Sequence, residues 1–259
     1  MLNNSDEMYR FLIATTYGYD VKSDDPGYIK LKKACSRRAY LDLARVVPYK
    51  YSVSKVVEYS KNKEMENEII SFQEIKKAFL DKIENKLIEK KEIKSAQEII
   101  CSVFLSAKEY NDKVFSESVN CSNNEPFTYG MAQKWVNMYY KYLWLFSYSE
   151  DCIKDCLDFP KELDMPIDSY IIDALFEEGI LSEEVCNDEK TPLRDLIVTK
   201  NRKIKKTGRT SESILKWSGW NCEIYNEVQK HIKKKCSTMK KHILEFENDL
   251  WLKRVTEEK

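Results

Sequence analysis

The stretch that decides the fold is FTYGMAQKWVNMYYKYLWLF, residues 127–146, the longest dense apolar run in the chain. Several of its large side chains recur every three or four residues, the period of a helix, namely Met131, Trp135, Met138, Tyr142 and Leu145. Other apolar residues fill most of the remaining circumference, namely Ala132, Val136, Tyr139, Tyr140, Leu143 and Phe146. A helix that is apolar almost all round is buried. The sequence therefore predicts a central buried helix over residues 129–146.

A narrow polar stripe interrupts this helix. Gln133, Asn137 and Lys141 follow one another at four-residue steps, and Lys134 lies beside them. On a helix this spacing places the side chains on one face. Because buried amide and ammonium groups are costly without partners, we expect the stripe to line a solvent cleft or to serve a functional site. The alternative is that its side chains bond to loop carbonyls.

The composition favours an all-α fold, an irregular multi-helix bundle around the central buried helix. With only six Gly and six Pro in 259 residues, the chain has few breakers, which favours helices over a many-stranded β fold. The loop CSNNEP at 121–126 is the only plausible boundary. It divides an amino-terminal helical layer, residues 1–120, from the central helix and carboxy-terminal helical region, residues 121–259. We expect the two parts to form one compact unit.

Start and stop signals place the other helices. In the amino-terminal part they indicate a helix over 32–47 that ends at Pro48, an amphipathic helix within 59–94, and a helix that begins at Ser95, which has capping-box spacing to Glu98. In the carboxy-terminal part they indicate a short helix after Pro166 with Asp168 or Ser169 as its cap and Gly179 at its end, and a long helix from about Asn221 with Ser218 as a candidate cap.

The charged residues cancel over the whole chain but are segregated along it. Residues 147–190 carry fourteen acidic residues against three lysines, and residues 200–241 carry thirteen basic residues against three glutamates. The basic block, residues 200–241, could follow a nucleic-acid backbone, with two tryptophans for base stacking. Equally, it could pair with the acidic block, residues 147–190, of the same chain. The candidate nucleic-acid contacts in the basic block are Lys203, Lys205, Lys206, Arg209, Trp217 and Trp220.

The cysteines and the apolar runs limit the class of protein. None of the eight cysteines has CxxC spacing, and the chain has only two histidines, so we expect no metal site and no cofactor. Free buried thiols in a reducing cytoplasm are the simplest interpretation. The amino terminus lacks the features of a signal peptide, and no stretch reaches the roughly 18 uninterrupted apolar residues that a membrane span needs. We therefore expect a cytoplasmic protein without a membrane partner.

The motif set AQKWVNMYYKYLW, then MPIDSYII, then WS followed by Tyr225 and Gln229, resembles a widespread group of uncharacterised bacterial proteins. The segment RAYLDLAR at 38–45 fits that group as well. The similarity covers about half the chain, and AQKxxNxxxKYLW is its most specific element. It implies a bacterial or phage source and no particular activity.

A fainter similarity is to the helix–hairpin–helix DNA glycosylases. Gly130 precedes Lys134 by four residues, and the segment Pro166-Ile167-Asp168 follows, which resembles the hairpin glycine, lysine and Pro-x-Asp segment of those enzymes. The resemblance implies that Lys134 attacks the sugar, that Asp168 deprotonates it or stabilises cationic charge, and that backbone N–H groups near Gly130 hold a phosphate. The chain has one glycine where the family hairpin has two, and its lysine-to-aspartate spacing is longer.

Three classes of function remain open from the sequence. The first is an intracellular protein that binds an anionic partner, nucleic acid above all, through residues 200–241. The second is a DNA glycosylase-like enzyme that uses Lys134 and Asp168. The third is a non-catalytic helical adaptor whose partner is another protein. Whether the chain is an enzyme therefore stays undecided at this level.

Overall fold

The structure is a computed structural model that describes residues 4–21, 24–44, 77–88, 95–114, 127–147, 157, 159–182, 185, 191–193 and 216–257. Within these ranges every regular element is helical, and no strand occurs, which confirms the all-α prediction. The elements are α1 (Asn4–Tyr17), η1 (Pro26–Tyr28), α2 (Ile29–Leu43), helical residues 77–88, α5 (Ala96–Val114), α6 (Tyr129–Ser147), α8 (Ser169–Glu177), η2 (Trp217–Gly219), α11 (Cys222–Met239) and α12 (Ile243–Glu257).

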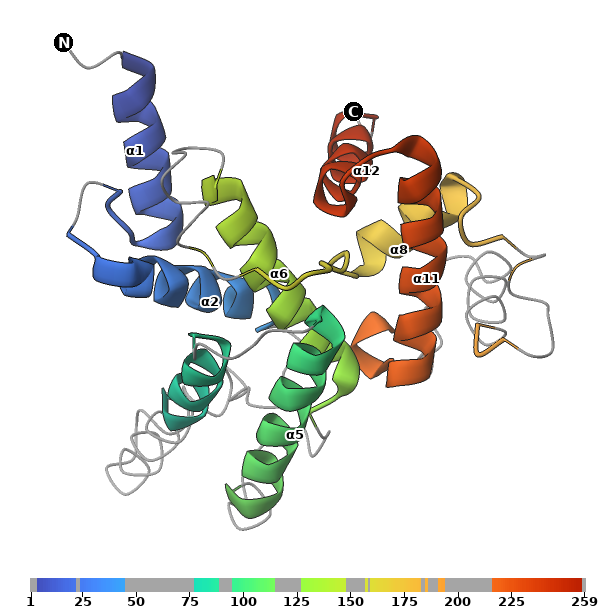
Figure 1. Cartoon of the computed structure of the whole chain (residues 1–259), viewed down its shortest axis with the longest axis horizontal. Helices are drawn as coiled ribbons and strands as arrows, with labels where there is room; N and C mark the ends of the chain where they lie inside the picture. The colour runs from blue at the N-terminus through green and yellow to red at the C-terminus, as the bar shows by residue number, and fades with distance from the viewer. Residues whose placement is uncertain are drawn as a thin grey trace, which may run out of the picture.

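Helix α6 is the centre of the bundle. It has α1 and α2 on one side, α5 near its amino-terminal end, and α8, α11 and α12 on the other side (Figure 1). Every residue of α6 is buried except Trp144 and Leu145, and Leu145 is 37% exposed. Its first turn is capped by Thr128, whose Oγ1 accepts the Met131 N–H at 3.1 Å. The prediction of a central buried helix is confirmed.

The helices on the α2 side keep the predicted apolar faces. Helix α2 begins at Ile29, three residues before the predicted start, and the predicted end at Pro48 lies outside the described residues. Of the amphipathic segment, the described part 77–88 is helical, and three residues of its apolar seam are buried, namely Phe79, Ile83 and Leu87. Together these faces enclose one side of α6.

Two predicted helix caps, those of α5 and α8, are confirmed. The Ser95 Oγ accepts the Glu98 N–H at 3.2 Å at the start of α5. Asp168, not Ser169, caps α8, and its Oδ1 accepts the Ile171 N–H at 3.0 Å. Gly179 follows the end of α8 with a φ of +66°, the left-handed conformation that glycine adopts freely. The predicted loop at 121–126 and the boundary drawn there lie outside the described residues.

The long carboxy-terminal helix that the sequence predicts is two helices. Lys240 has a φ of 52° and ends α11, and α12 begins at Ile243. A left-handed residue at a helix end is usually glycine, so a lysine there leaves no signal in the sequence. The cap is also corrected, because Asn221 rather than Ser218 accepts a hydrogen bond from an N–H of the first turn, at 2.9 Å.

The cysteines only partly match the expectation of buried thiols. Four lie in the described part of the chain and are free. Cys35 and Cys236 are buried, whereas Cys101 and Cys222 are exposed, which corrects the expectation for these two. Helix α5 turns Cys101 away from the core, and Cys222 lies in the exposed first turn of α11. Among the described helices, none is long and apolar enough to cross a membrane.

Candidate active site

A non-helical segment, residues 163–168, contacts both α6 and α11 and is held by two glutamines. Gln133 of α6 donates from Nε2 to the Ile167 carbonyl at 3.0 Å and accepts the Ile167 N–H on Oε1 at 3.3 Å. Gln229 of α11 makes the same two hydrogen bonds with Met165. Its Nε2 donates to the Met165 carbonyl at 2.7 Å, and its Oε1 accepts the Met165 N–H at 3.0 Å. Each side-chain amide thus supplies the donor and acceptor that a neighbouring strand would supply. We call Gln133 and Gln229 the glutamine clamp.

A second set of buried polar groups extends from the clamp. The Asn137 Nδ2 donates to the Tyr225 hydroxyl at 2.7 Å, and that hydroxyl donates to Asp164 Oδ2 at 2.9 Å. Burial and the Asp164 charge raise the pKa of Tyr225 well above its ordinary value, so its hydroxyl stays a neutral donor. Lys233 Nζ lies 2.7 Å from Asp164 Oδ1. A buried network with these partners fixes the path of residues 163–168.

Residues 163–168 place Asp168 beside Lys134. The Lys134 Nζ donates to Asp168 Oδ2 at 2.8 Å, while the other carboxylate oxygen, Oδ1, caps α8. The lysine side chain is 6% exposed and the aspartate side chain 22% exposed, so the pair opens to solvent on the Asp168 side. In the glutamine clamp, Gln133 makes two hydrogen bonds to the backbone of Ile167, the residue before Asp168. These bonds fix the position of the Asp168 carboxylate.

The Asp168 carboxylate is ionised. Burial alone would raise its pKa, but the Lys134 charge, its hydrogen bond, and the backbone N–H groups of Ile171 and Tyr170 lower the pKa below its ordinary value. The carboxylate of this pair is therefore charged at neutral pH. Such a pair can pass one proton from nitrogen to oxygen when a bound substrate changes its surroundings.

A second lysine–carboxylate pair lies seven residues further along α6. Lys141 Nζ contacts Glu247 Oε2 of α12, and the Glu247 side chain is 2% exposed. Burial raises the pKa of Glu247 even though the Lys141 and Lys134 charges lower it. The polar stripe therefore reaches two carboxylates, one at the cap of α8 and one on α12, and the Asn137 Nδ2 donates to Gln133 Oε1 at 3.3 Å.

The stripe is a buried contact surface and not an open cleft. Gln133, Lys134, Asn137 and Lys141 are all buried, and each bonds to α8, α11, α12 or residues 163–168. The sequence reasoning missed the partners Asp164, Gln229 and Glu247. A signal for Glu247 was present, because it stands among the apolar residues of α12. Gln229 also stands on the apolar face of α11, one residue after Val228.

Only two of the residues proposed for nucleic-acid contacts in the basic block, Trp217 and Trp220, lie among the described residues. Lys203, Lys205, Lys206 and Arg209 lie outside the described residues. Trp217 is half-buried, and Trp220 is 1% exposed, so the Trp220 ring offers no face to a base in this structure. This corrects its assignment as a stacking surface.

Gly130 also has a local role at the start of α6. Its N–H donates to the Trp220 carbonyl at 3.0 Å, so this N–H is not presented to a phosphate in the structure. A Cβ at Gly130 would lie 2.0 Å from the Trp217 carbonyl oxygen. The close approach of η2 to α6 therefore requires a glycine here.

In the part of the chain that the structure describes, no group of three or more His, Cys, Asp or Glu side chains is placed to hold a metal ion. The sequence matches no family model, and comparisons with characterised proteins and with solved structures gave no match. The geometry of Lys134 and Asp168 is therefore the basis for assigning a function.

Proposed function

We propose that this protein is an enzyme that acts on the deoxyribose of DNA, with Lys134 as an amine nucleophile and Asp168 as its proton acceptor. The observation that carries the proposal is the 2.8 Å contact between Lys134 Nζ and Asp168 Oδ2, which joins residues 34 positions apart. The lysine comes from the buried central helix and the aspartate from the amino-terminal cap of α8. This arrangement agrees with the roles that the resemblance to DNA glycosylases implies for the two residues.

A contribution to stability alone does not explain why Lys134 and Asp168 form a charged pair at this position. The cap on α8 needs only a side-chain oxygen, and Asn or Ser would provide it as well as Asp. A lysine on the buried face of α6 has to lose its hydration, and replacing a buried ion pair by apolar residues often leaves stability unchanged or raises it. A charged pair in such a place, with a carboxylate side chain that is 22% exposed, is a candidate for chemistry.

The proposed reaction starts with transfer of one proton from Lys134 Nζ to Asp168. The neutral amine attacks C1′ of the deoxynucleotide, so that an Nζ–C1′ bond forms and the glycosidic bond breaks. The base leaves with the bonding electron pair and takes up a second proton from Nζ. The nitrogen lone pair then forms the C=N bond, the C1′–O4′ bond breaks, and protonated Asp168 returns its proton to O4′. The product is a protonated imine between Lys134 and the sugar.

The test is borohydride trapping, because hydride converts that imine into a stable amine. The full chain is incubated with duplex oligonucleotides that carry an abasic site or a modified base, and the adduct is mapped by mass spectrometry. We expect the adduct on Lys134, and we expect Lys134→Gln to abolish it. Asp168→Asn keeps the cap but removes the proton acceptor, so the trapping rate should fall by about 10²- to 10⁴-fold, the usual share of general base catalysis.

The matched control is Lys230→Gln, which removes an exposed lysine of α11 and should leave trapping unchanged. Circular dichroism and melting of each variant separate loss of chemistry from loss of fold. An adduct on another lysine, or trapping by Lys134→Gln at the rate of the unmodified chain, would refute the assignment. Failure to trap any of the oligonucleotides would refute the choice of deoxyribose as substrate.

A further inference from the structure

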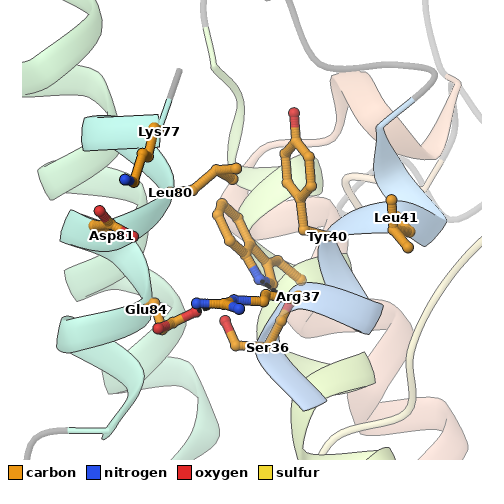
Figure 2. Close-up of a pocket in the computed structure, with 9 residues that line it drawn as sticks. Ser36, Arg37, Tyr40, Leu41, Lys77, Leu80, Asp81 and Glu84 are labelled. Carbon is orange, nitrogen blue, oxygen red and sulfur yellow. Dashed lines mark hydrogen bonds and ion pairs between the residues drawn. The ribbon is translucent and has the colours of Figure 1, made fainter. Parts of the chain in front are cut away.

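A groove of about 500 Å³ lies between α2 and helical residues 77–88. Trp135 of α6 is one of its lining residues, and Figure 2 shows the side chains that α2 and helical residues 77–88 contribute. A volume of this size is typical of sites for small molecules. The groove has a polar end and an apolar end, and the two ends together define what could bind there.

The polar end contains Ser36, Arg37 and Glu84. Arg37 Nε donates to Glu84 Oε2 at 3.2 Å, and Lys33 Nζ lies 3.7 Å from Glu84 Oε1, so the second carboxylate oxygen is held only loosely. The terminal NH₂ groups of Arg37 make no hydrogen bond among the described residues. This end therefore presents an acceptor and several donors side by side.

The Ser36 hydroxyl is the clearest indication of a binding site. Ser36 is 1% exposed, and its Oγ has no hydrogen-bond partner among the described residues. Its carbonyl is occupied, because it accepts from Trp135 Nε1 at 3.0 Å. In Figure 2 the hydroxyl points toward helical residues 77–88, between Arg37 and Glu84. A buried hydroxyl without a partner is costly, and a ligand atom at this place would satisfy it.

The apolar end is lined by two aromatic side chains and two leucines. Tyr40 and Trp135 lie with their ring centroids 5.2 Å apart and their planes tilted by 51°. Leu80 forms the facing wall, and Leu41 is 60% exposed at the mouth. Because Trp135 is 1% exposed and Tyr40 is 5% exposed, a bound flat ring takes most of its apolar contact from Leu80 and Leu41.

The charges of the lining cancel, because it contains two basic residues, Arg37 and Lys77, and two acidic residues, Asp81 and Glu84. An uncharged ligand suits this balance. We propose that the groove binds a planar, uncharged heteroaromatic ring with an N–H donor next to a carbonyl acceptor on one edge, as guanine has. The ring N–H donates to Glu84 Oε1, and the ring carbonyl accepts from Arg37 and from the Ser36 hydroxyl. The proposal is independent of the chemistry at Lys134.

The experiment is a titration of the full chain with guanosine, 1-methylguanosine and indole by calorimetry or by NMR. Guanosine should bind saturably with a Kd below about 1 mM. The 1-methyl group removes the N1–H and adds bulk against Glu84, so that ligand should bind at least about tenfold more weakly, as expected where a site hydrogen-bonds the lost group. Indole has the ring without the carbonyl and should bind weakly too.

Two variants test the site itself. Ser36→Ala removes a hydroxyl that is unpartnered in the free protein, so it should leave the melting temperature equal or higher while it weakens guanosine binding about three- to tenfold. Arg37→Gln changes an exposed side chain and should weaken binding to a similar degree. Leu41→Glu should block the mouth, whereas Leu105→Glu, an equally exposed leucine on α5, serves as the control.

No saturable binding of guanosine overturns the proposal. Binding that survives Ser36→Ala, Arg37→Gln and Leu41→Glu unchanged overturns it as well, because the ligand then lies elsewhere. Equal affinity for indole and guanosine overturns the assignment of the polar edge and leaves an apolar slot.

Discussion

Helix α6 carries two lysine–carboxylate pairs, and they differ in exposure and in the protonation behaviour of the acid. The open pair, Lys134 with Asp168, has a carboxylate that is 22% exposed and whose pKa is lowered. The sealed pair, Lys141 with Glu247, has a carboxylate that is 2% exposed and whose pKa is raised by burial. The two lysines are seven residues apart, two turns of one helix, so the helix itself does not explain the difference.

The difference comes from the acids. Asp168 begins a helix, so the backbone N–H groups of the first turn of α8 stabilise its negative charge. Glu247 lies inside α12, where backbone N–H groups are already used, and its desolvation is offset only in part, by its bond to Lys141 and by the charges of Lys141 and Lys134. A charge that the backbone stabilises locally can remain at an opening, whereas a charge stabilised only by lysine side chains is enclosed with them. The open pair is thus suited to chemistry and the sealed pair to linking α6 with α12.

The largest expected effect is on activity, which should depend on the open pair and not on the sealed pair. Replacing the sealed pair with apolar residues, Lys141→Met with Glu247→Leu, should leave borohydride trapping on DNA within a few-fold of the unmodified chain. Lys134→Gln should abolish it, because the nucleophile is lost. Equal loss of trapping in both variants would show that the pairs act as one unit.

The second effect is on stability. Lys141→Met alone leaves Glu247 buried without a partner, which should cost about 3–5 kcal/mol, whereas the double change Lys141→Met with Glu247→Leu should recover most of that loss. Urea unfolding of the three proteins measures both quantities. If the double variant is as unstable as the single one, the lysine stabilises α6 through packing of its stem and not through its charge.

The open pair was accessible from the sequence in part. The boundaries of α6 and the Asp168 cap follow from local signals, namely the helical period and an Asp after a proline. The approach of Lys134 to Asp168 follows only from the resemblance to glycosylases, because no local pattern relates residues 34 positions apart. The glutamine clamp that produces this approach was not anticipated, since each amide bonds to backbone far away in the sequence.

The sealed pair was not accessible from the sequence. Lys141 was expected on the polar stripe, but its partner lies 106 residues away on α12. The prediction of one long helix from Asn221 would have carried Glu247 away from α6. The left-handed Lys240 turns the chain so that α12 returns to the core, and a lysine in that conformation has no sequence signature.

A third prediction concerns DNA binding by the basic block, residues 200–241. The reaction proposed for the open pair requires such binding, whereas the structural role of the sealed pair does not. In the described part of the basic block, Lys233 is engaged by Glu162 at 3.2 Å and by Asp164 at 2.7 Å, so this lysine pairs with the acidic block. Changing Lys203, Lys205 and Lys206 to Glu should weaken oligonucleotide binding. The slope of log affinity against log salt should fall by about 0.7 to 0.9 for each phosphate that the variant no longer neutralises.

The measurement is a titration of single- and double-stranded oligonucleotides over a salt series. Lys230→Glu, which changes an exposed lysine of α11 already paired with Glu227, is the control. If the triple variant binds like the unmodified chain, or if neither protein binds at low salt, pairing of the basic block with residues 147–190 is the better account.

The smallest effect is on the pH dependence of stability, and its sign should differ between the pairs. Glu247 has a folded pKa above the ordinary 4.5, so the stability it contributes is complete below pH 4.5 and is lost as the pH rises through its folded pKa. Asp168 has a folded pKa below the ordinary 3.8, so its contribution is present above pH 3.8 and is lost as the pH falls through the folded pKa. A tenfold change in proton affinity corresponds to only about 1.4 kcal/mol.

Urea unfolding across the acidic and neutral range measures these slopes, with each pair removed in turn. The stability advantage of the unmodified chain over Lys141→Met with Glu247→Leu should decrease as the pH rises above 4.5, since the variant lacks the group whose pKa is raised. Its advantage over Lys134→Met with Asp168→Asn should decrease as the pH falls below 3.8, and the asparagine keeps the α8 cap in that comparison. Slopes of the same sign would mean that Asp168 and Glu247 share one environment, and the distinction between an open and a sealed pair would then fail.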